Sequence, residues 1–70
     1  MQARLIFGRN VARLRAERGL TQEQLAERAE IDRSYVQRVE RGTSSPTVDA
    51  ALRIKRSLRC SWEDLLKGLD

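Results

Sequence analysis

The sequence predicts an all-α protein with a single domain over residues 1–70, and three observations predict it. Apolar residues recur at helical spacing, and no segment shows the alternation typical of a strand. Capping residues and glycines divide the chain into five short helical segments. The 70 residues allow one small core, because a chain of this size buries only about 60% of its unfolded surface.

The first two predicted helices are separated by a glycine. In the first helix, apolar residues recur at helical spacing, namely Leu5, Ile6, Val11, Ala12 and Leu14. Gly19 is a natural residue to follow the end of this helix. Thr21 and Gln24 fit a capping box, so the second helix begins abruptly after Thr21 and ends at about Ala29.

The third predicted helix, residues 33–41, is amphipathic. Asp32 is a suitable N-cap, and Gly42 ends the helix. At 100° per residue, the polar side chains occupy an arc of about 140°, and Val36 and Val39 face away from it. An ordinary surface helix has the same pattern, so periodicity alone leaves open whether the polar arc binds a partner.

The last two predicted helices follow the loop "GTSSPT", which is rich in turn residues. Thr47, or alternatively Ser45 with Pro46 as the first helical residue, caps a fourth helix that ends at about Leu58. The inward side chains of this helix are predicted to be Ala51, Leu52, Ile54 and Leu58. Ser61 caps a fifth, short helix that carries Leu65, Leu66 and Leu69.

Charge and composition narrow the class of protein. The chain has 14 Lys and Arg against 10 Asp and Glu, a net charge of +4, which indicates an anionic partner. It has no histidine and one cysteine, so we expect no intrachain disulfide, no zinc cluster and no cofactor. Cys60 is predicted to be a small buried or half-buried residue. Neither a nucleophile–base pair nor a metal set is present, which argues against an enzyme.

The early apolar run Leu5-Ile6-Phe7 is far shorter than a signal-peptide core or a membrane span. We therefore expect a cytoplasmic protein without membrane contact.

Residues 21–41 form a predicted helix-turn-helix. Two short capped helices flank a three-residue turn, 30–32, and in this arrangement the second helix protrudes enough to enter a major groove of DNA. Ala26 is small enough for the helices to cross closely, and Ile31 fills the turn.

Four motifs carry a family resemblance: "RGLTQEQLA", "IDRSYVQRVERG", Pro46-Thr47 and the final "SWEDLL". Together, from about Val11 to Leu66, they resemble the lambda-repressor-like (Cro/C1-type) helix-turn-helix family. The resemblance implies a five-helix DNA-binding domain. Within the family, "DRSYVQRVERG" is most similar to the controller proteins of restriction–modification systems, while phage-type repressors and antitoxins are other small members.

The resemblance also implies roles for individual side chains. Base contacts are expected from the front of the third helix, from Arg33, Ser34, Gln37 and Arg38. Arginine can pair with guanine and glutamine with adenine, and a short serine lets the helix approach closely. Phosphate contacts are expected from Gln22, Tyr35, Arg41, Thr43 and Ser44. Two alternatives remain, a half-buried packing role for Tyr35 and an interaction of Arg41 with the helix dipole.

Other positions are structural in the resemblance. Arg15 and Glu40 are expected to form a partly buried ion pair that joins the first helix to the third. Glu30 and Arg59 stand where the family often has glycine or asparagine. A left-handed conformation at either position would cost about 1 kcal/mol.

A single domain of this size reads only about four or five base pairs, so the resemblance implies a homodimer. Residues from about 48 to 70 are the expected dimerisation region, with Trp62, Leu65 and Leu69 in the interface. Alternatively, Leu65 and Leu66 simply close the core.

The predicted function is therefore a sequence-specific transcriptional regulator that binds a palindromic operator in double-stranded DNA. The alternative is an antitoxin or another protein-interaction module with secondary DNA binding. A contact with RNA polymerase is also open, through the acidic residues beside the turn, namely Glu23, Glu27, Glu30 and Asp32.

Overall fold

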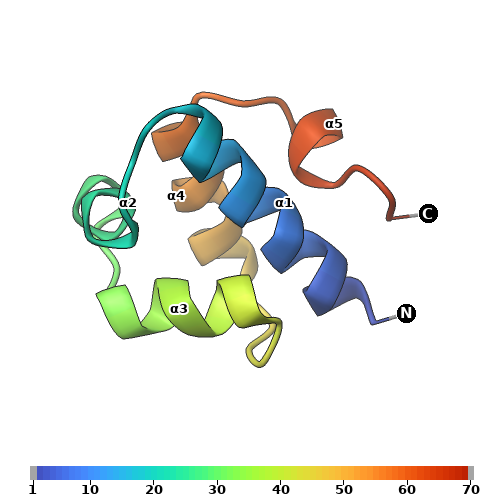
Figure 1. The fold of residues 1–70 in the computed structure, drawn as a ribbon. Helices are drawn as coiled ribbons and strands as arrows, with labels where there is room; N and C mark the ends of the chain where they lie inside the picture. Colours follow the sequence, from blue (N-terminus) through green and yellow to red (C-terminus); the bar gives the residue numbers. More distant parts are fainter. Residues whose placement is uncertain (1, 70) are drawn as a thin grey trace.

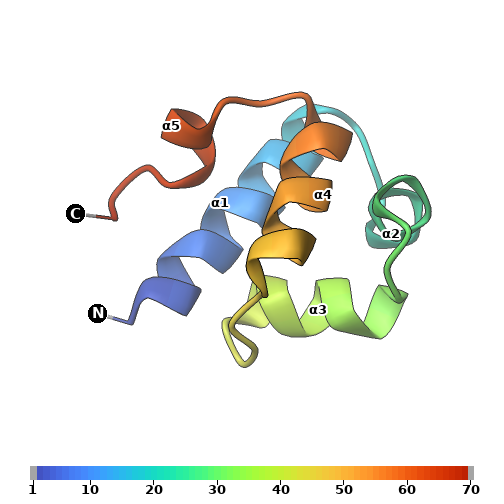
Figure 2. The same cartoon turned by 180° about the vertical axis from the view of Figure 1, so that it is seen from behind.

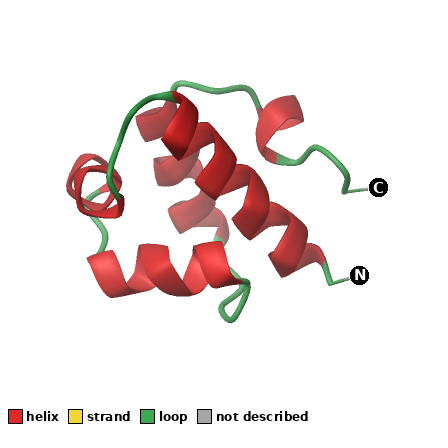
Figure 3. Cartoon of the chain, in the orientation of Figure 1, coloured by secondary structure: helices red, strands yellow, loops and turns green. Residues whose placement is uncertain are grey.

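The computed structural model describes residues 2–69, in which the regular structure is helical throughout (Figures 1 and 3). Its helices are α1 (Ala3–Glu17), α2 (Gln22–Ala29), α3 (Arg33–Arg41), α4 (Val48–Leu58) and α5 (Trp62–Leu65). This confirms the predicted all-α architecture. None of the helices in this part of the chain is long and apolar enough to cross a membrane.

The long helix α1 organises the fold. It packs against α3, α4 and α5, and α2 packs against α3 and α4. Figure 1 shows α3 along one edge of the molecule with α2 at its beginning, and Figure 2 shows α4 lying beside α1 on the opposite face. The first turn of α1 and the segment after α5 lie on the same side of the molecule, away from α2 (Figure 1). The helix-turn-helix therefore occupies one side of the molecule and α5 the other.

Side-chain caps define the starts of four helices. The Thr21 hydroxyl accepts a hydrogen bond from the Gln24 backbone N–H, and the Gln24 side chain accepts one from the Thr21 backbone N–H. The Asp32 carboxylate caps α3, and the Ser61 hydroxyl caps α5. Thr47, rather than Ser45, caps α4. These contacts satisfy N–H groups that would otherwise lack a partner at a helix start.

Helix α3 ends at Gly42, as predicted, and two other helices end at non-glycine residues with left-handed backbone conformations. Glu30, after α2, has φ 56°, and Arg59, after α4, has φ 52°. Each costs about 1 kcal/mol relative to glycine. The turn is closed by a hydrogen bond of 3.0 Å from the Ile31 N–H to the Ala26 carbonyl, so the chain turns sharply into α3 despite the missing glycine.

One hydrophobic core joins the helices. Its fully buried side chains come from all five of them, namely Val11, Leu14, Leu25, Val36, Val39, Ile54, Leu58 and Leu65. The prediction for α4 was partly wrong, because Ala50 is buried and Leu52 is only half-buried. Phe7 and Leu20 also belong to the core. Cys60 is buried, as predicted.

Gly8 allows α1 and α3 to approach closely. A Cβ atom added there would collide with the backbone carbonyl of Val39 and lie 3.0 Å from that of Glu40. Because both neighbours are backbone atoms, a side chain at position 8 would push the helices apart. The position of α3 relative to α1 therefore depends on this glycine.

The buried side chain of Asn10 attaches the C-terminal segment to α1. Its amide donates hydrogen bonds to the carbonyls of Leu65, at 2.8 Å, and Lys67, at 2.9 Å. Helix α5 ends at Leu65 after a single turn, so Leu66 and Leu69 lie beyond it, contrary to the prediction. Asn10 supplies the donor that these carbonyls need at the helix end.

Candidate nucleic-acid interface

Helix α3 divides into a buried face and an outward face. Val36 and Val39 have no exposed surface. The four side chains predicted to contact bases lie on the other face, where Arg33, Ser34 and Arg38 are exposed and Gln37 is half-buried. The fold therefore brings these four side chains together on the side of α3 that faces away from the core.

The side chains at the start of the outward face contact one another. The Asp32 carboxylate accepts hydrogen bonds from both the backbone N–H and the hydroxyl of Ser34. Arg38 Nη1 donates to Ser34 Oγ at 3.3 Å. The two bonds from Ser34 hold the pKa of Asp32 below its usual value, and the charges of Arg38 and Arg33 lower it further. Asp32 therefore stays ionised beside the arginines at neutral pH.

Tyr35 is held from two sides. Its ring is half-buried against the core, which agrees with the packing alternative, and its hydroxyl accepts a hydrogen bond of 3.3 Å from the Thr47 backbone N–H. The guanidinium of Arg38 lies 5.6 Å from the centre of the ring. The phenolic proton of Tyr35 remains available to an external acceptor such as a phosphate.

Three further predicted contact residues lie at and after the C-terminal end of α3. Arg41 is exposed, and no ion pair joins it to another described residue. The backbone N–H and the hydroxyl of Thr43 both donate to the Arg38 carbonyl, at 3.0 and 3.2 Å. Ser44 is half-buried in the loop that follows. These three predicted phosphate-contacting residues therefore lie at or just after the C-terminal end of α3.

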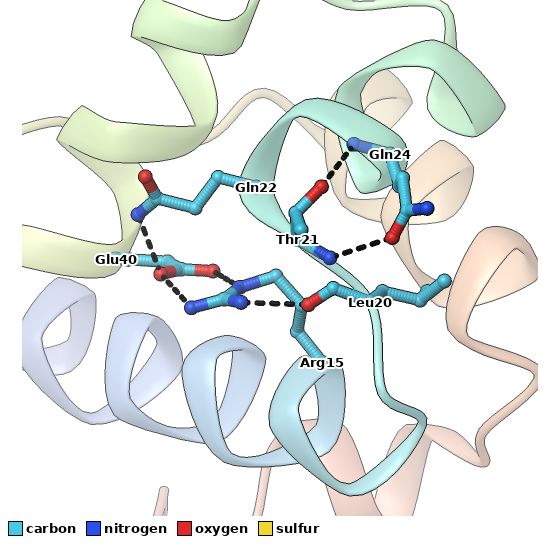
Figure 4. A network of polar contacts seen from close by, with 6 residues as sticks. All are labelled: Arg15, Leu20, Thr21, Gln22, Gln24 and Glu40. Atoms are coloured by element: carbon cyan, nitrogen blue, oxygen red, sulfur yellow. Dashed lines mark hydrogen bonds and ion pairs between the residues drawn. The ribbon is translucent and has the colours of Figure 1, made fainter.

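A polar network joins α1, α2 and α3 behind that face (Figure 4). Arg15 binds the Glu40 carboxylate with two nitrogens, Nε at 2.6 Å and Nη2 at 3.1 Å, and its Nη1 donates to the Leu20 carbonyl at 2.8 Å. Only 7% of the Glu40 side chain and 20% of the Arg15 side chain are exposed. The structure thus forms the ion pair expected from the resemblance.

Gln22 belongs to the same network. Its amide Nε2 donates to Glu40 Oε1 at 2.9 Å, and the residue is half-buried (Figure 4). The sequence placed this side chain at the exposed start of the helix and did not predict the bond to Glu40. An amide has two N–H groups, so one donor remains for an acceptor at the start of α2.

The C-terminal segment carries an exposed apolar patch, which consists of Trp62, Leu66 and Leu69. Trp62 is 39% exposed and Leu66 is 38% exposed, while Leu69 is half-buried. These residues line a shallow hollow at the end of the chain. The amine of Lys55 lies 5.6 Å from the Trp62 ring centre.

Two sequence assignments in this segment need correction. Leu65 is fully buried and cannot serve as an interface residue, because the single turn of α5 points it into the core. Leu66 does not close the core, because it follows the end of the helix and faces outward. The apolar pattern "WEDLL" did not reveal which leucine is buried, since that depends on where α5 ends.

Two features bear on catalytic chemistry among the described residues. Between residues 2 and 69, no three His, Cys, Asp or Glu side chains are placed to hold a metal ion. Burial raises the pKa of the Cys60 thiol, which disfavours the reactive thiolate. The polar face of α3 and its flanks are the most distinctive chemical feature of the surface.

Known proteins that resemble this chain share its helix-turn-helix. A family model described as helix-turn-helix matches residues 11–65. The uncharacterized HTH-type transcriptional regulator y4dJ of Sinorhizobium fredii is 37% identical over 70 residues, which cover 100% of this chain and 91% of that protein. The restriction–modification controller protein C.AhdI from Aeromonas hydrophila superimposes with a TM-score of 0.85 at 35% identity, covering 89% and 94% of the two chains.

The chain also resembles another controller protein, whose structure was solved in complex with DNA. The tetramer of C.Esp1396I in complex with its natural 35 base-pair operator superimposes with a TM-score of 0.82 at 25% identity. The match covers 96% of this chain and 99% of that one. The likeness thus extends over both the helix-turn-helix and the C-terminal segment.

Proposed function

Because this chain belongs to the Cro/C1-like helix-turn-helix family, we propose that it is a transcriptional regulator that binds a palindromic operator as a homodimer. The outward face of α3 carries the proposal, because its exposed side chains are suited to reading base edges. Arg33 and Arg38 present forked donors for guanine, Gln37 suits adenine, and Ser34 lets the helix approach closely. The proposed targets are restriction–modification genes, by analogy with the controller proteins that the chain resembles.

Phosphate contacts are proposed on both sides of the reading face. At the start of α2, the free N–H of Gln22 and the positive end of the helix favour a phosphate oxygen. At the other edge, Arg41, Thr43 and Ser44 supply a charge and hydroxyl groups, and Tyr35 has a phenolic proton to donate. Such contacts fix the orientation of the protein on the duplex without reading its sequence.

A homodimer is proposed through the region from about 48 to 70. The exposed apolar patch of Trp62, Leu66 and Leu69 is the surface that a second copy would cover. A two-fold axis through this region would place two α3 helices one turn of DNA apart, about 34 Å.

We also propose that this single domain acts in the cytoplasm, where operator DNA is accessible.

The other partners weighed from the sequence are less well supported. Of the acidic residues beside the turn, Glu23 lies 3.8 Å from Arg33 and Glu30 lies 3.7 Å from Arg53. Both pairs are long and both carboxylates are exposed, so the structure gives no particular support to a contact with RNA polymerase. The antitoxin alternative is not favoured, because the relatives described above are a transcriptional regulator and controller proteins.

Selection from random duplexes at two salt concentrations tests the proposal. We expect enrichment of a palindrome whose half-sites are about 10 base pairs apart. Arg38→Ala should relax the preference at one position of each half-site, by about 1–3 kcal/mol, while Gln22→Ala should weaken binding to all sequences alike. Arg13→Ala, on α1, is the matched loss of charge and should leave the preference unchanged. Binding that depends on salt but not on sequence would exclude a sequence-specific regulator.

A further inference from the structure

Arg38 is restrained by two neighbours on its own helix. Ser34 and Tyr35 precede it by four and three residues, the spacings at which helical side chains meet. Its Nη1 donates to the Ser34 hydroxyl oxygen at 3.3 Å, and its guanidinium lies 5.6 Å from the Tyr35 ring centre. That distance is within the range of a cation–π contact. The side chain of Arg38, although exposed, is therefore held in position in the protein without DNA.

The restraining groups are themselves fixed. The Ser34 hydroxyl donates to the Asp32 carboxylate, which leaves its oxygen lone pairs directed towards Arg38. The Tyr35 ring packs against the core, and its hydroxyl is bound by the backbone N–H of Thr47 at the start of α4. The ring therefore cannot turn away from Arg38 without breaking contacts in two other parts of the fold.

We propose that Tyr35 is a positioning residue for base recognition by Arg38. The ring holds the guanidinium in place before DNA arrives, which reduces the side-chain freedom that Arg38 loses on binding a base. The hydroxyl has a separate task, because it accepts from Thr47 and keeps its own proton for a phosphate. This inference rests on the proposed function, in which Arg38 reads a base.

Two substitutions separate the ring from the hydroxyl. Tyr35→Phe removes the phosphate donor and the acceptor for Thr47, but keeps the ring packed against the core and beside Arg38. We therefore expect weaker binding to all duplexes with the base preference retained. Tyr35→Leu keeps apolar contact with the core but removes the ring. We expect the preference at the base pair read by Arg38 to fall about two- to fivefold, the factor that corresponds to an exposed cation–π contact. The preference at the base pair read by Arg33 should not change.

The preference is measured as the ratio of affinities for the selected operator and for operators with one base pair replaced. Melting curves of Tyr35→Phe and Tyr35→Leu identify a temperature at which both variants are folded, and the affinities are measured at that temperature. In the background of Arg38→Ala, Tyr35→Leu should no longer alter the ratio at the Arg38 position. If Tyr35→Leu and Tyr35→Phe have the same base preference as the native chain, the positioning role is wrong.

A second measurement needs no DNA. Nitrogen-15 relaxation of the Arg38 Nε–Hε group reports its motion on the ps–ns timescale. The order parameter should be retained in Tyr35→Phe and reduced in Tyr35→Leu, and an equal value in both variants would overturn the inference. A native chain without any base preference would instead refute the proposed function, while the relaxation data would still decide whether Tyr35 holds Arg38.

Discussion

Removal of the Glu40 carboxylate should destabilise the fold more than any substitution of a surface charge. Glu40 is bound by two nitrogens of Arg15 and by the Gln22 amide, and only 7% of its side chain is exposed. In Glu40→Ala, the Arg15 guanidinium keeps its bond to the Leu20 carbonyl but loses its counterion. A largely buried positive charge is then left without a partner.

The size of the effect follows from this burial. Breaking a buried ion pair from one side costs about 3–5 kcal/mol. Because 20% of the Arg15 side chain is exposed and one hydrogen bond survives, we expect a value near the lower end, about 3 kcal/mol. For a domain of this size, that corresponds to a fall in melting temperature of about 12–24 °C. The whole domain is expected to be stable by only about 4–10 kcal/mol, so the variant should be marginally folded.

Thermal unfolding followed by circular dichroism is the assay. Glu17→Ala is the matched control, because Glu17 is paired at 3.3 Å with Arg13 and Arg18 on an exposed surface. Exposed pairs of this kind contribute about 0–1 kcal/mol, so this variant should melt within a few degrees of the native chain. If Glu40→Ala melts with the control, the ion pair does not hold α1 to α3 and the reasoning fails.

Three further substitutions test other contacts. Gly8→Ala puts a methyl group against backbone carbonyls of α3, so its melting temperature should fall further than that of Gly19→Ala. At Gly19 the added group meets nothing within 4 Å, and the only cost is the strain of its φ of 68°, about 1 kcal/mol. Asn10→Ala leaves two carbonyls unpaired at the end of α5, which should cost about 1–3 kcal/mol and speed amide hydrogen exchange in α5 more than in α3. Ser34→Ala removes the hydroxyl that lowers the pKa of Asp32, so an NMR titration should give a higher pKa. Because the pKa of Asp32 is lowered in the folded state, its ionised carboxylate stabilises the fold at pH values above its ordinary pKa of 3.8. This stability is lost as the pH falls through the lowered pKa. The native chain should therefore lose stability more steeply than Ser34→Ala below about pH 4.

The starts of four helices were predictable because their causes are local. Thr21, Asp32, Thr47 and Ser61 each accept from a backbone N–H two or three residues ahead, so the signal lies within one turn of sequence. The outward face of α3 was also predictable, since helical periodicity fixes which side chains share a face. The resemblance then supplied the ion pair of α1 with α3, which residue spacing alone did not contain.

Contacts between distant segments were not predictable in the same way. Gly8 is one glycine in a helix until α3 is placed against it, and Asn10 is one polar residue until the end of α5 lies above it. The bond of Gln22 to Glu40 and the exposure of Leu66 could not be predicted for the same reason. Each depends on where another helix ends or crosses, and the local pattern carries no information about that.

The two faces of α3 separate the side chains proposed to read DNA from those that hold the helix in the core, with one exception. Arg33 and Arg38 are exposed, and their polar contacts reach only α3 itself and α2, so changes there should alter DNA preference with little effect on melting. Tyr35 differs, because one side of its ring packs on the core while Arg38 lies over the ring and Thr47 binds its hydroxyl. A substitution of Tyr35 acts on packing and on the reading face together. For this reason the role in recognition proposed for Tyr35 can be tested only when the ring and the hydroxyl are removed separately.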